Sequence, residues 1–177
     1  MHISSRGRTN MPKKDELHGI KYLYEVGPDD PERIRDLVEV TGFFYAAETD
    51  VAEELVLERL SKGGESGYHF VLAEDNGRLI AYTCYGPIAC TASSYDLYWI
   101  AVHPDFQGIG LGKRILNETE SLIREAGGTR IYVETSQRPQ YASTRAFYED
   151  QGYLQESLLR DFYGPGDGKV TYCKVLS

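Results

Sequence analysis

The sequence has few cysteines and no long apolar run. Its three cysteines, Cys84, Cys90 and Cys173, form no C-x-x-C pair and cannot all pair with one another. This pattern favours inert, reduced thiols over a disulfide framework. A membrane-spanning helix would need about 18 consecutive apolar residues, and no such stretch is present. Residues 1–19 lack the apolar centre of a signal peptide, so we expect them to form a flexible tail on a cytoplasmic protein.

Positive charge is also scarce. The 177 residues include 19 Lys and Arg against 27 Asp and Glu, a formal net charge of −8. This balance argues against nonspecific binding of nucleic acid or an anionic membrane, and it is compatible with a cationic or amine substrate. Metal-ligand spacing, internal repeats and linkers are absent from the sequence. The length corresponds to about one domain, which we expect over residues 20–177.

The most informative segment covers residues 97–113. An apolar strand pattern ends at Val102, and Gly108, Gly110 and Gly112 then open a helical pattern. The backbone N–H groups of such a turn converge at a helix N-terminus, where the helix dipole favours negative charge. The segment therefore predicts a site for a phosphate-bearing ligand.

The spacing of the glycines excludes two nucleotide motifs. Counted from Gly108, a dinucleotide fingerprint would need a glycine in place of Lys113, and a P-loop would need one in place of Gln107. What remains is Gln107-x-x-Gly110-x-Gly112, directly after a strand. This pattern resembles the coenzyme A pyrophosphate loop, Q/R-x-x-G-x-G/A, of the GNAT superfamily, the general N-acetyltransferases.

A second motif supports the same resemblance. The stretch from Tyr141 to Tyr153 is similar to the GNAT segment N-x-x-A-x-x-F-Y-x-x-x-G-F. The matching positions are Phe147, Tyr148, Gly152 and Tyr153. Tyr141 replaces the usual Asn, which puts the side-chain contact to coenzyme A from that position in question, and Thr144 replaces the usual Ala. With both motifs in the family's order, the chain is identified as a member of this superfamily.

The order of local patterns agrees with one α/β domain. Strand patterns cover 20–26, 68–74, 78–85, 95–102, 130–135, 158–163 and 169–175, and helical patterns begin near 31, 50, 108 and 143. Asn76-Gly77 is a two-residue hairpin signal, and Asp50 with Glu53 is a candidate capping box for the second helix. The resemblance implies the GNAT fold, a mixed central sheet of about seven strands flanked by four helices.

The resemblance also implies an acetyl transfer to an amine, with Tyr148 as general acid toward the coenzyme A sulfur. Asp96 is the candidate general base, because histone-type members carry a catalytic glutamate at the corresponding place. A water chain without a dedicated base is an alternative, as are Glu48 and Glu53. Strand alternation predicts that Asp96, Tyr98 and Ile100 share one face.

Acetyl-CoA is the implied cosubstrate, and no metal is expected. In the family the strand before the loop is bulged and splays from the next strand, so its main chain can polarise the thioester. The residues expected at the cofactor are Ile100, Ala101, Val102, Gln107, Gly108, Ile109, Gly110, Leu111, Gly112, Lys113 and Tyr141.

The acceptor is expected between the first two helices and the turn before the last strand. The candidates are Phe43, Phe44, Tyr45 and Glu48 early in the chain, and Asp161, Phe162 and Tyr163 late in it. We favour a small amine: an amino acid, amino sugar or polyamine. A peptide N-terminus is an alternative, because residues 160–167 resemble the tyrosine-bearing turn of the ribosomal-protein alanine acetyltransferases. Two further hypotheses stay open. The chain could be a non-catalytic module that senses acyl-CoA, and an exposed strand edge near the C-terminus could pair in a homodimer.

Overall fold

The structure, a computed structural model, describes residues 19–177, so the predicted N-terminal tail lies almost wholly outside the described residues. In this part of the chain, seven strands form one mixed sheet in the order β1-β2-β3-β4-β5-β7-β6, accompanied by four α-helices. This confirms the predicted α/β class and its count of strands and helices.

The elements follow the predicted order. The strands are β1 Lys21–Leu23, β2 His69–Asp75, β3 Arg78–Pro87, β4 Ser94–Val102, β5 Arg130–Ser136, β6 Leu154–Gly164 and β7 Asp167–Val175. The helices are α1 Asp30–Thr41, α2 Ala46–Lys62, α3 Leu111–Glu125 and α4 Ala142–Asp150. The β2–β3 hairpin turns at Asn76 and Gly77, which have φ angles of 50° and 80°, as a two-residue turn requires.

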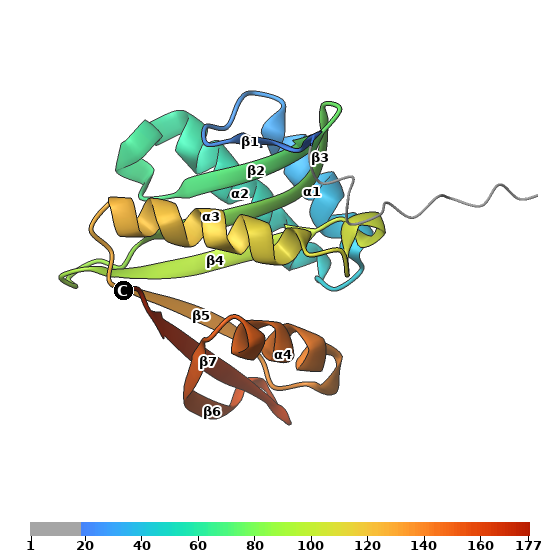
Figure 1. Ribbon diagram of the computed structural model, residues 1–177. Coiled ribbons are helices and arrows are strands. Elements are labelled where there is room, and N and C mark those ends of the chain that lie inside the picture. Colours follow the sequence, from blue (N-terminus) through green and yellow to red (C-terminus); the bar gives the residue numbers. More distant parts are fainter. Residues whose placement is uncertain (1–18) are drawn as a thin grey trace, which may run out of the picture.

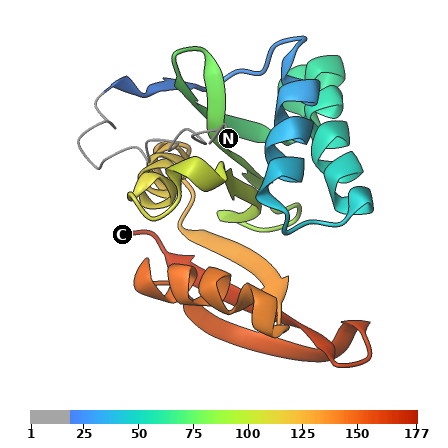
Figure 2. The same ribbon diagram turned by 90° about the vertical axis from the view of Figure 1, so that its right-hand side faces the viewer.

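Two hydrophobic cores lie on opposite faces of the sheet. Helices α1 and α2 cover one face of β2–β4, with Ile34, Val56 and Phe70 fully or almost fully buried between them. Helices α3 and α4 lie on the other face (Figures 1 and 2), where Ile115 and Ile131 are fully buried. The sheet is therefore a wall between an α1–α2 side and an α3–α4 side.

The sheet opens between β4 and β5. These parallel strands pair only over Ser94–Leu97 and Arg130–Val133. Beyond that point they diverge, as Figure 1 shows, and β5 continues its ladder with β7 instead. The edge of β4 from Tyr98 to Val102 therefore has no strand partner on its β5 side, which leaves backbone hydrogen-bonding groups free for a ligand.

A β-bulge at Tyr98 corrects one prediction. Cys84 of β3 pairs with Trp99, and the next residue of β3 pairs with Leu97, so Tyr98 is the extra residue. The bulge shifts the alternation of side chains. Leu97 and Ile100 consequently pack on the same side, in the α3–α4 core. The prediction that Asp96 and Ile100 share a face was wrong: Asp96, next to Leu97, lies on the α1–α2 side.

The start of α2 also differs from the prediction. The helix begins at Ala46, and the backbone N–H of Tyr45 donates to the Glu48 carboxylate at 2.8 Å. Asp50 and Glu53 do not cap the helix. They pair instead with Arg35 of α1, at 2.9 and 2.6 Å. A tertiary ion pair between the two helices thus uses the carboxylates that looked like a local cap.

The two parts of the sheet, β1–β4 and β5-β7-β6, are joined by side chains on the α3–α4 side. Lys174 of β7 pairs with Glu120 of α3 at 2.7 Å, and the Tyr153 hydroxyl donates to the same carboxylate at 3.1 Å. Glu120 is only 4% exposed. This buried cluster connects α3 to β7 across the opening.

Candidate active site

A large cavity occupies the opening between β4 and β5. Its volume is about 1240 Å³. It is bounded by the free edge of β4, the glycine-rich loop, α4, the α1–α2 connection and the ends of β5 and β7. The predicted site residues that line it are Phe43, Tyr45, Glu48, Asp96, Ile100, Ala101, Val102, Gln107, Gly108, Gly110, Gly112, Lys113, Tyr141, Tyr148 and Tyr163.

The glycine-rich loop has the geometry of an anion cradle. Gly108 and Gly110 have φ angles of 74° and 94°, and no atom lies within 4 Å of the position a Cβ would take at either. Gly110 caps the 15-residue helix α3, whose first N–H groups face this space. The side chain of Gln107 donates to the Val102 carbonyl at 3.0 Å and holds the loop against β4. The loop therefore fits a pyrophosphate group.

Tyr148 reaches the cavity from α4. Its side chain is 5% exposed, and its ring lies 5.5 Å from the rings of both Phe147 and Tyr153. Burial raises the pKa of the Tyr148 phenol above its ordinary value. The group therefore stays protonated at neutral pH and can donate a proton.

Asp96 reaches the cavity from β4. Its parallel register partner is Tyr132, and within residues 19–177 no hydrogen bond or ion pair holds its carboxylate. Burial, and then the nearby charge of Glu134, raise the pKa of Asp96, while Lys169 opposes the shift. Lys169 itself is paired with Glu134 at 2.9 Å. A half-buried, unpaired carboxylate of raised pKa is suited to accept a proton.

The α1–α2 connection and the β6–β7 turn form the other walls. Phe43 and Tyr45 come from the first, and Glu48 from the adjoining first turn of α2. Tyr163 comes from the end of β6, next to the second. Burial, followed by the charge of Glu134, raises the pKa of Tyr163 to about 12. This end of the cavity therefore combines aromatic rings with carboxylates.

Some predicted residues do not line the cavity. Leu111 is fully buried, so only its backbone could meet a ligand, and Ile109 is partly buried against the α3–α4 core. Glu53, the alternative base, is occupied by Arg35. Tyr141, in place of the family's Asn, does line the cavity, but its hydroxyl donates to the Phe43 carbonyl at 3.3 Å.

Several cavity residues were not found from the sequence. They are Thr41, Tyr98, Trp99, Tyr132, Glu134, Thr135, Ser136, Arg138, Ser143, Thr144, Phe147 and Asp167, with Leu97, Gly164 and Pro165. Phe44, an acceptor candidate from the sequence, lines the cavity as well, whereas the candidates Asp161 and Phe162 do not. Arg138 is the most consequential, because it is a cation among carboxylates. The sequence signal that could have identified Arg138 was its position two residues after β5, a strand that ends beside the opening.

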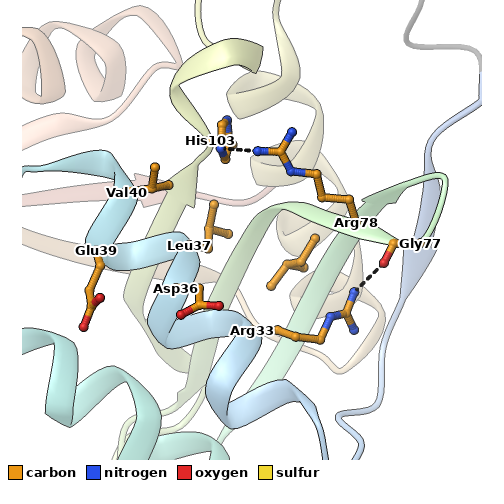
Figure 3. Close-up of a pocket in the computed structure, with 9 residues that line it drawn as sticks. Arg33, Asp36, Leu37, Glu39, Val40, Gly77, Arg78 and His103 are labelled. Carbon is orange, nitrogen blue, oxygen red and sulfur yellow. Dashed lines mark hydrogen bonds between the residues drawn. The ribbon is translucent and has the colours of Figure 1, made fainter.

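A second cavity, of about 650 Å³, lies between α1, the β2–β3 turn and His103 (Figure 3). Arg33 donates there to the Gly77 carbonyl at 3.3 Å and pairs with Asp30 at 2.6 Å. The Arg78 guanidinium lies 2.5 Å from Nε2 of His103, which must be the acceptor because a guanidinium can only donate. Both arginines are thus engaged, and none of the predicted site residues lines this cavity.

Residues 19–177 lack two further features. No helix in that range is long and apolar enough to cross a bilayer. No group of three or more His, Cys, Asp or Glu side chains in the same range is arranged to hold a metal ion.

The fold, the split sheet and the glycine-rich loop together define an acetyltransferase architecture. The sequence model of the acetyltransferase (GNAT) family matches residues 32–153, more than half of the chain. The chain therefore belongs to the GNAT family of acetyltransferases, as its two motifs predicted.

Individual relatives agree with this assignment. A crystallised Desulfovibrio desulfuricans protein assigned to the GNAT family is 44% identical, with a TM-score of 0.88 over 89% of this chain and 99% of that one. The [ribosomal protein bS18]-alanine N-acetyltransferase of Escherichia coli K12 is 29% identical over 62% of this chain and 70% of that protein. An aminoglycoside 6'-N-acetyltransferase complexed with coenzyme A shares the fold, at 19% identity and a TM-score of 0.69 over 88% and 96% of the two chains.

Proposed function

We propose that this protein transfers the acetyl group of acetyl-CoA to the primary amine of a small molecule, such as an amino acid, an amino sugar or a polyamine. The observation that carries the proposal is the arrangement of Asp96 and Tyr148. Both line the cavity at the sheet opening that also contains the glycine-rich loop.

Acetyl-CoA is the acetyl donor, and this chain offers groups that fit its parts. The N–H groups from Gly108 to Lys113 suit the pyrophosphate, as the open space beside Gly108 and Gly110 allows. The unpaired edge of β4 suits the amides of the pantetheine arm, which can pair with it as an added strand would. The thioester would then lie between Asp96 and Tyr148.

The residues of this chain then have distinct tasks. Asp96, directly or through a water, takes a proton from the acceptor ammonium, which frees the nitrogen lone pair to attack the thioester carbon. The C–N bond forms, the attacking nitrogen releases its second proton to solvent, and the C–S bond breaks. Asp96 then returns the proton that it accepted to solvent. Tyr148 gives its proton to the departing sulfur and regains one from solvent. Main-chain N–H groups of β4 near Ile100–Val102 polarise the thioester oxygen.

The charges around the cavity support an amine acceptor. Glu48 and Asp96 line it without a cation partner among residues 19–177, and Glu134 adds a third carboxylate. Opposite charges attract the protonated amine, and the aromatic rings of Phe43 and Tyr45 can pack against its apolar part.

A peptide N-terminus is the second candidate. The relatives that favour it are named for the N-terminal alanine of a ribosomal protein. Tyr163, from the turn that resembles theirs, lines the cavity here. The two candidates differ in the size of the acceptor.

The test is the release of free thiol from acetyl-CoA with amino acids, polyamines, aminoglycosides and short peptides with free N-termini. We expect thiol that depends on one class of small amine and falls sharply in Tyr148→Phe. Thiol release with peptides alone would replace the small amine with the second candidate. No amine-dependent release across the panel would contradict both.

A further inference from the structure

Arg138 connects the two walls of the acceptor side of the cavity. Its Nη1 donates to the hydroxyl of Tyr45, at the start of α2. Its Nε pairs with Asp167, the first residue of β7, at 3.0 Å. The guanidinium carbon also lies 5.3 Å from the Tyr45 ring centroid and 5.7 Å from that of Tyr141. One side chain thus holds the α1–α2 connection to the β6–β7 hairpin.

A second link lies beside the first. The Tyr141 hydroxyl donates to the Phe43 carbonyl at 3.3 Å. Among residues 19–177, these are the side-chain hydrogen bonds that cross the sheet opening on the α1–α2 side. We call Arg138, Tyr45 and Asp167 the Arg138 bridge. Its three members all line the cavity.

Hydrogen bonds fix the backbone around Arg138. The backbone N–H of Arg138 donates to Oγ of Ser136 at 3.0 Å, and the Ser136 hydroxyl donates to Asp167. From α4, the Arg145 guanidinium donates to the carbonyls of Ser136 and Arg138, at 2.7 and 3.1 Å. The backbone from which Arg138 extends is therefore anchored to β7 and α4, so its guanidinium is directed across the opening.

We propose that Arg138 is a specificity-determining residue: the Arg138 bridge closes the acceptor side of the cavity to an extended chain and admits small amines. The inference rests on the proposed acetyl transfer to an amine. A peptide whose N-terminal amine lay at Asp96 would have to leave between the α1–α2 connection and the β6–β7 hairpin. The bridge joins these two walls by contacts of hydrogen-bond length, so that route is blocked by Arg138.

The charge of the bridge adds to its shape. The Arg138 cation neutralises Asp167, and Lys169 pairs with Glu134. The cavity carboxylates without a cation partner among residues 19–177, Glu48 and Asp96, attract cations. A small amine that enters beside the bridge meets these carboxylates directly. Removal of the Arg138 side chain would leave Tyr45 and Asp167 unconnected and open the passage between them.

The experiment compares the wild-type protein with Arg138→Ala on two acceptors: the best small amine and a hexapeptide with a free N-terminus. We expect the ratio of kcat/KM for the hexapeptide to kcat/KM for the small amine to rise at least tenfold in Arg138→Ala. KM for acetyl-CoA should change less than twofold. Arg138→Lys keeps the charge but cannot contact Tyr45 and Asp167 through two separate nitrogens, so it should give an intermediate ratio. Tyr45→Phe, which removes the hydroxyl that accepts from Arg138, should do the same.

Arg160→Ala is the matched control. Arg160 lies on β6 in the same hairpin, but it does not line the cavity, so its removal should leave the ratio unchanged. An unchanged ratio in Arg138→Ala, in a protein that still turns over, would overturn the inference. A wild-type preference for the hexapeptide over every small amine would overturn it as well.

Failure of the proposed function has a different signature. In that case the wild-type protein releases no thiol with any acceptor, and amide hydrogen exchange over residues 43–49 tests the Arg138 bridge without turnover. Faster exchange of these amides in Arg138→Ala than in the wild type and in Arg160→Ala supports the bridge. Equal exchange in all three proteins overturns it.

Discussion

Asp96 and Tyr148 line one cavity from opposite faces of the sheet. Asp96 lies on the α1–α2 side of β4, because the neighbouring Leu97 packs in the α3–α4 core. Tyr148 belongs to that α3–α4 core. A thioester held in the opening would therefore have the proposed proton acceptor, Asp96, on one side and the proposed proton donor, Tyr148, on the other. This arrangement would separate the two proposed proton transfers in space.

Replacing Tyr148 with phenylalanine should lower kcat by about 10²–10⁴-fold, the usual contribution of a general acid. Coenzyme A binding, measured by calorimetry, should stay within twofold, because the ring and its packing remain. Tyr153→Phe is the matched control. Its ring lies 5.5 Å from Tyr148, but its hydroxyl is bonded to Glu120, away from the cavity. Equal losses in the two variants would contradict a proton-donor role for Tyr148.

Replacing Asp96 with asparagine should remove the acidic limb of the pH–kcat/KM profile. Since burial raises the pKa of Asp96, that limb in the wild type should lie above the ordinary range of an aspartate. The raised pKa also means that the folded protein binds the proton more tightly than the unfolded chain. Stability from this group is therefore lost as pH rises through the folded-state pKa.

Thermal unfolding tests the sign of that linkage. Asp96→Asn should be more stable than the wild type at pH 8, and the difference should shrink as pH falls through the raised folded-state pKa and be gone below the ordinary pKa of an aspartate. A variant that is less stable at pH 8 would show that the Asp96 carboxylate contributes favourably to the fold. A retained acidic limb would point to another base or to a water chain.

Replacing Gly110 with alanine should weaken coenzyme A binding and cost roughly 1–2 kcal/mol of stability, because an L-residue is strained at its φ of 94°. The space beside it is open, so the effect is conformational and not a steric clash. Gly127→Ala, at φ 85° beyond the far end of α3, provides the same kind of strain away from the cavity. It should lose comparable stability and retain its affinity for coenzyme A, as measured by calorimetry and urea unfolding.

Replacing Lys174 with methionine should destabilise the fold by about 2–3 kcal/mol, because it leaves the buried Glu120 carboxylate with only the Tyr153 hydroxyl. This is below the loss typical of a fully buried pair, since 23% of the Lys174 side chain is exposed. Urea unfolding measures the change. Lys62→Met, which removes an exposed pair with Glu58, should leave the midpoint unaltered. A similar result for Lys174→Met would show that the buried pair is energetically neutral.

The sequence predicted local features well and tertiary ones less well. Asn76-Gly77 forms the predicted β2–β3 turn, because such a turn depends on the backbone preferences of its two residues. The capping box at Asp50 and Glu53 was wrong because those carboxylates pair with Arg35 of another helix. A local pattern cannot show that a distant partner competes for the same side chains.

The bulge at Tyr98 is the clearest limit of sequence reasoning. Strict alternation along β4 placed Asp96 with Ile100, whereas the extra residue puts Asp96 with Trp99 and Ala101. Nothing in the strand's composition signals this shift, because a bulge arises from the register between two strands. The side of the sheet from which Asp96 reaches the cavity therefore came from the structure.

The sequence by itself determined the order of helices and strands, the glycine-rich loop and the motif that carries Tyr148. These features depend on hydrophobic periodicity, turn residues and short spacings, all of which act over a few residues. Only the tertiary structure decided which distant residues come together: Asp96 and Tyr148 line one cavity at the opening of the sheet, and Arg138 contacts Tyr45 and Asp167 across it. The physical reason is that strand pairing and the point where β4 and β5 separate are set by packing of the whole chain.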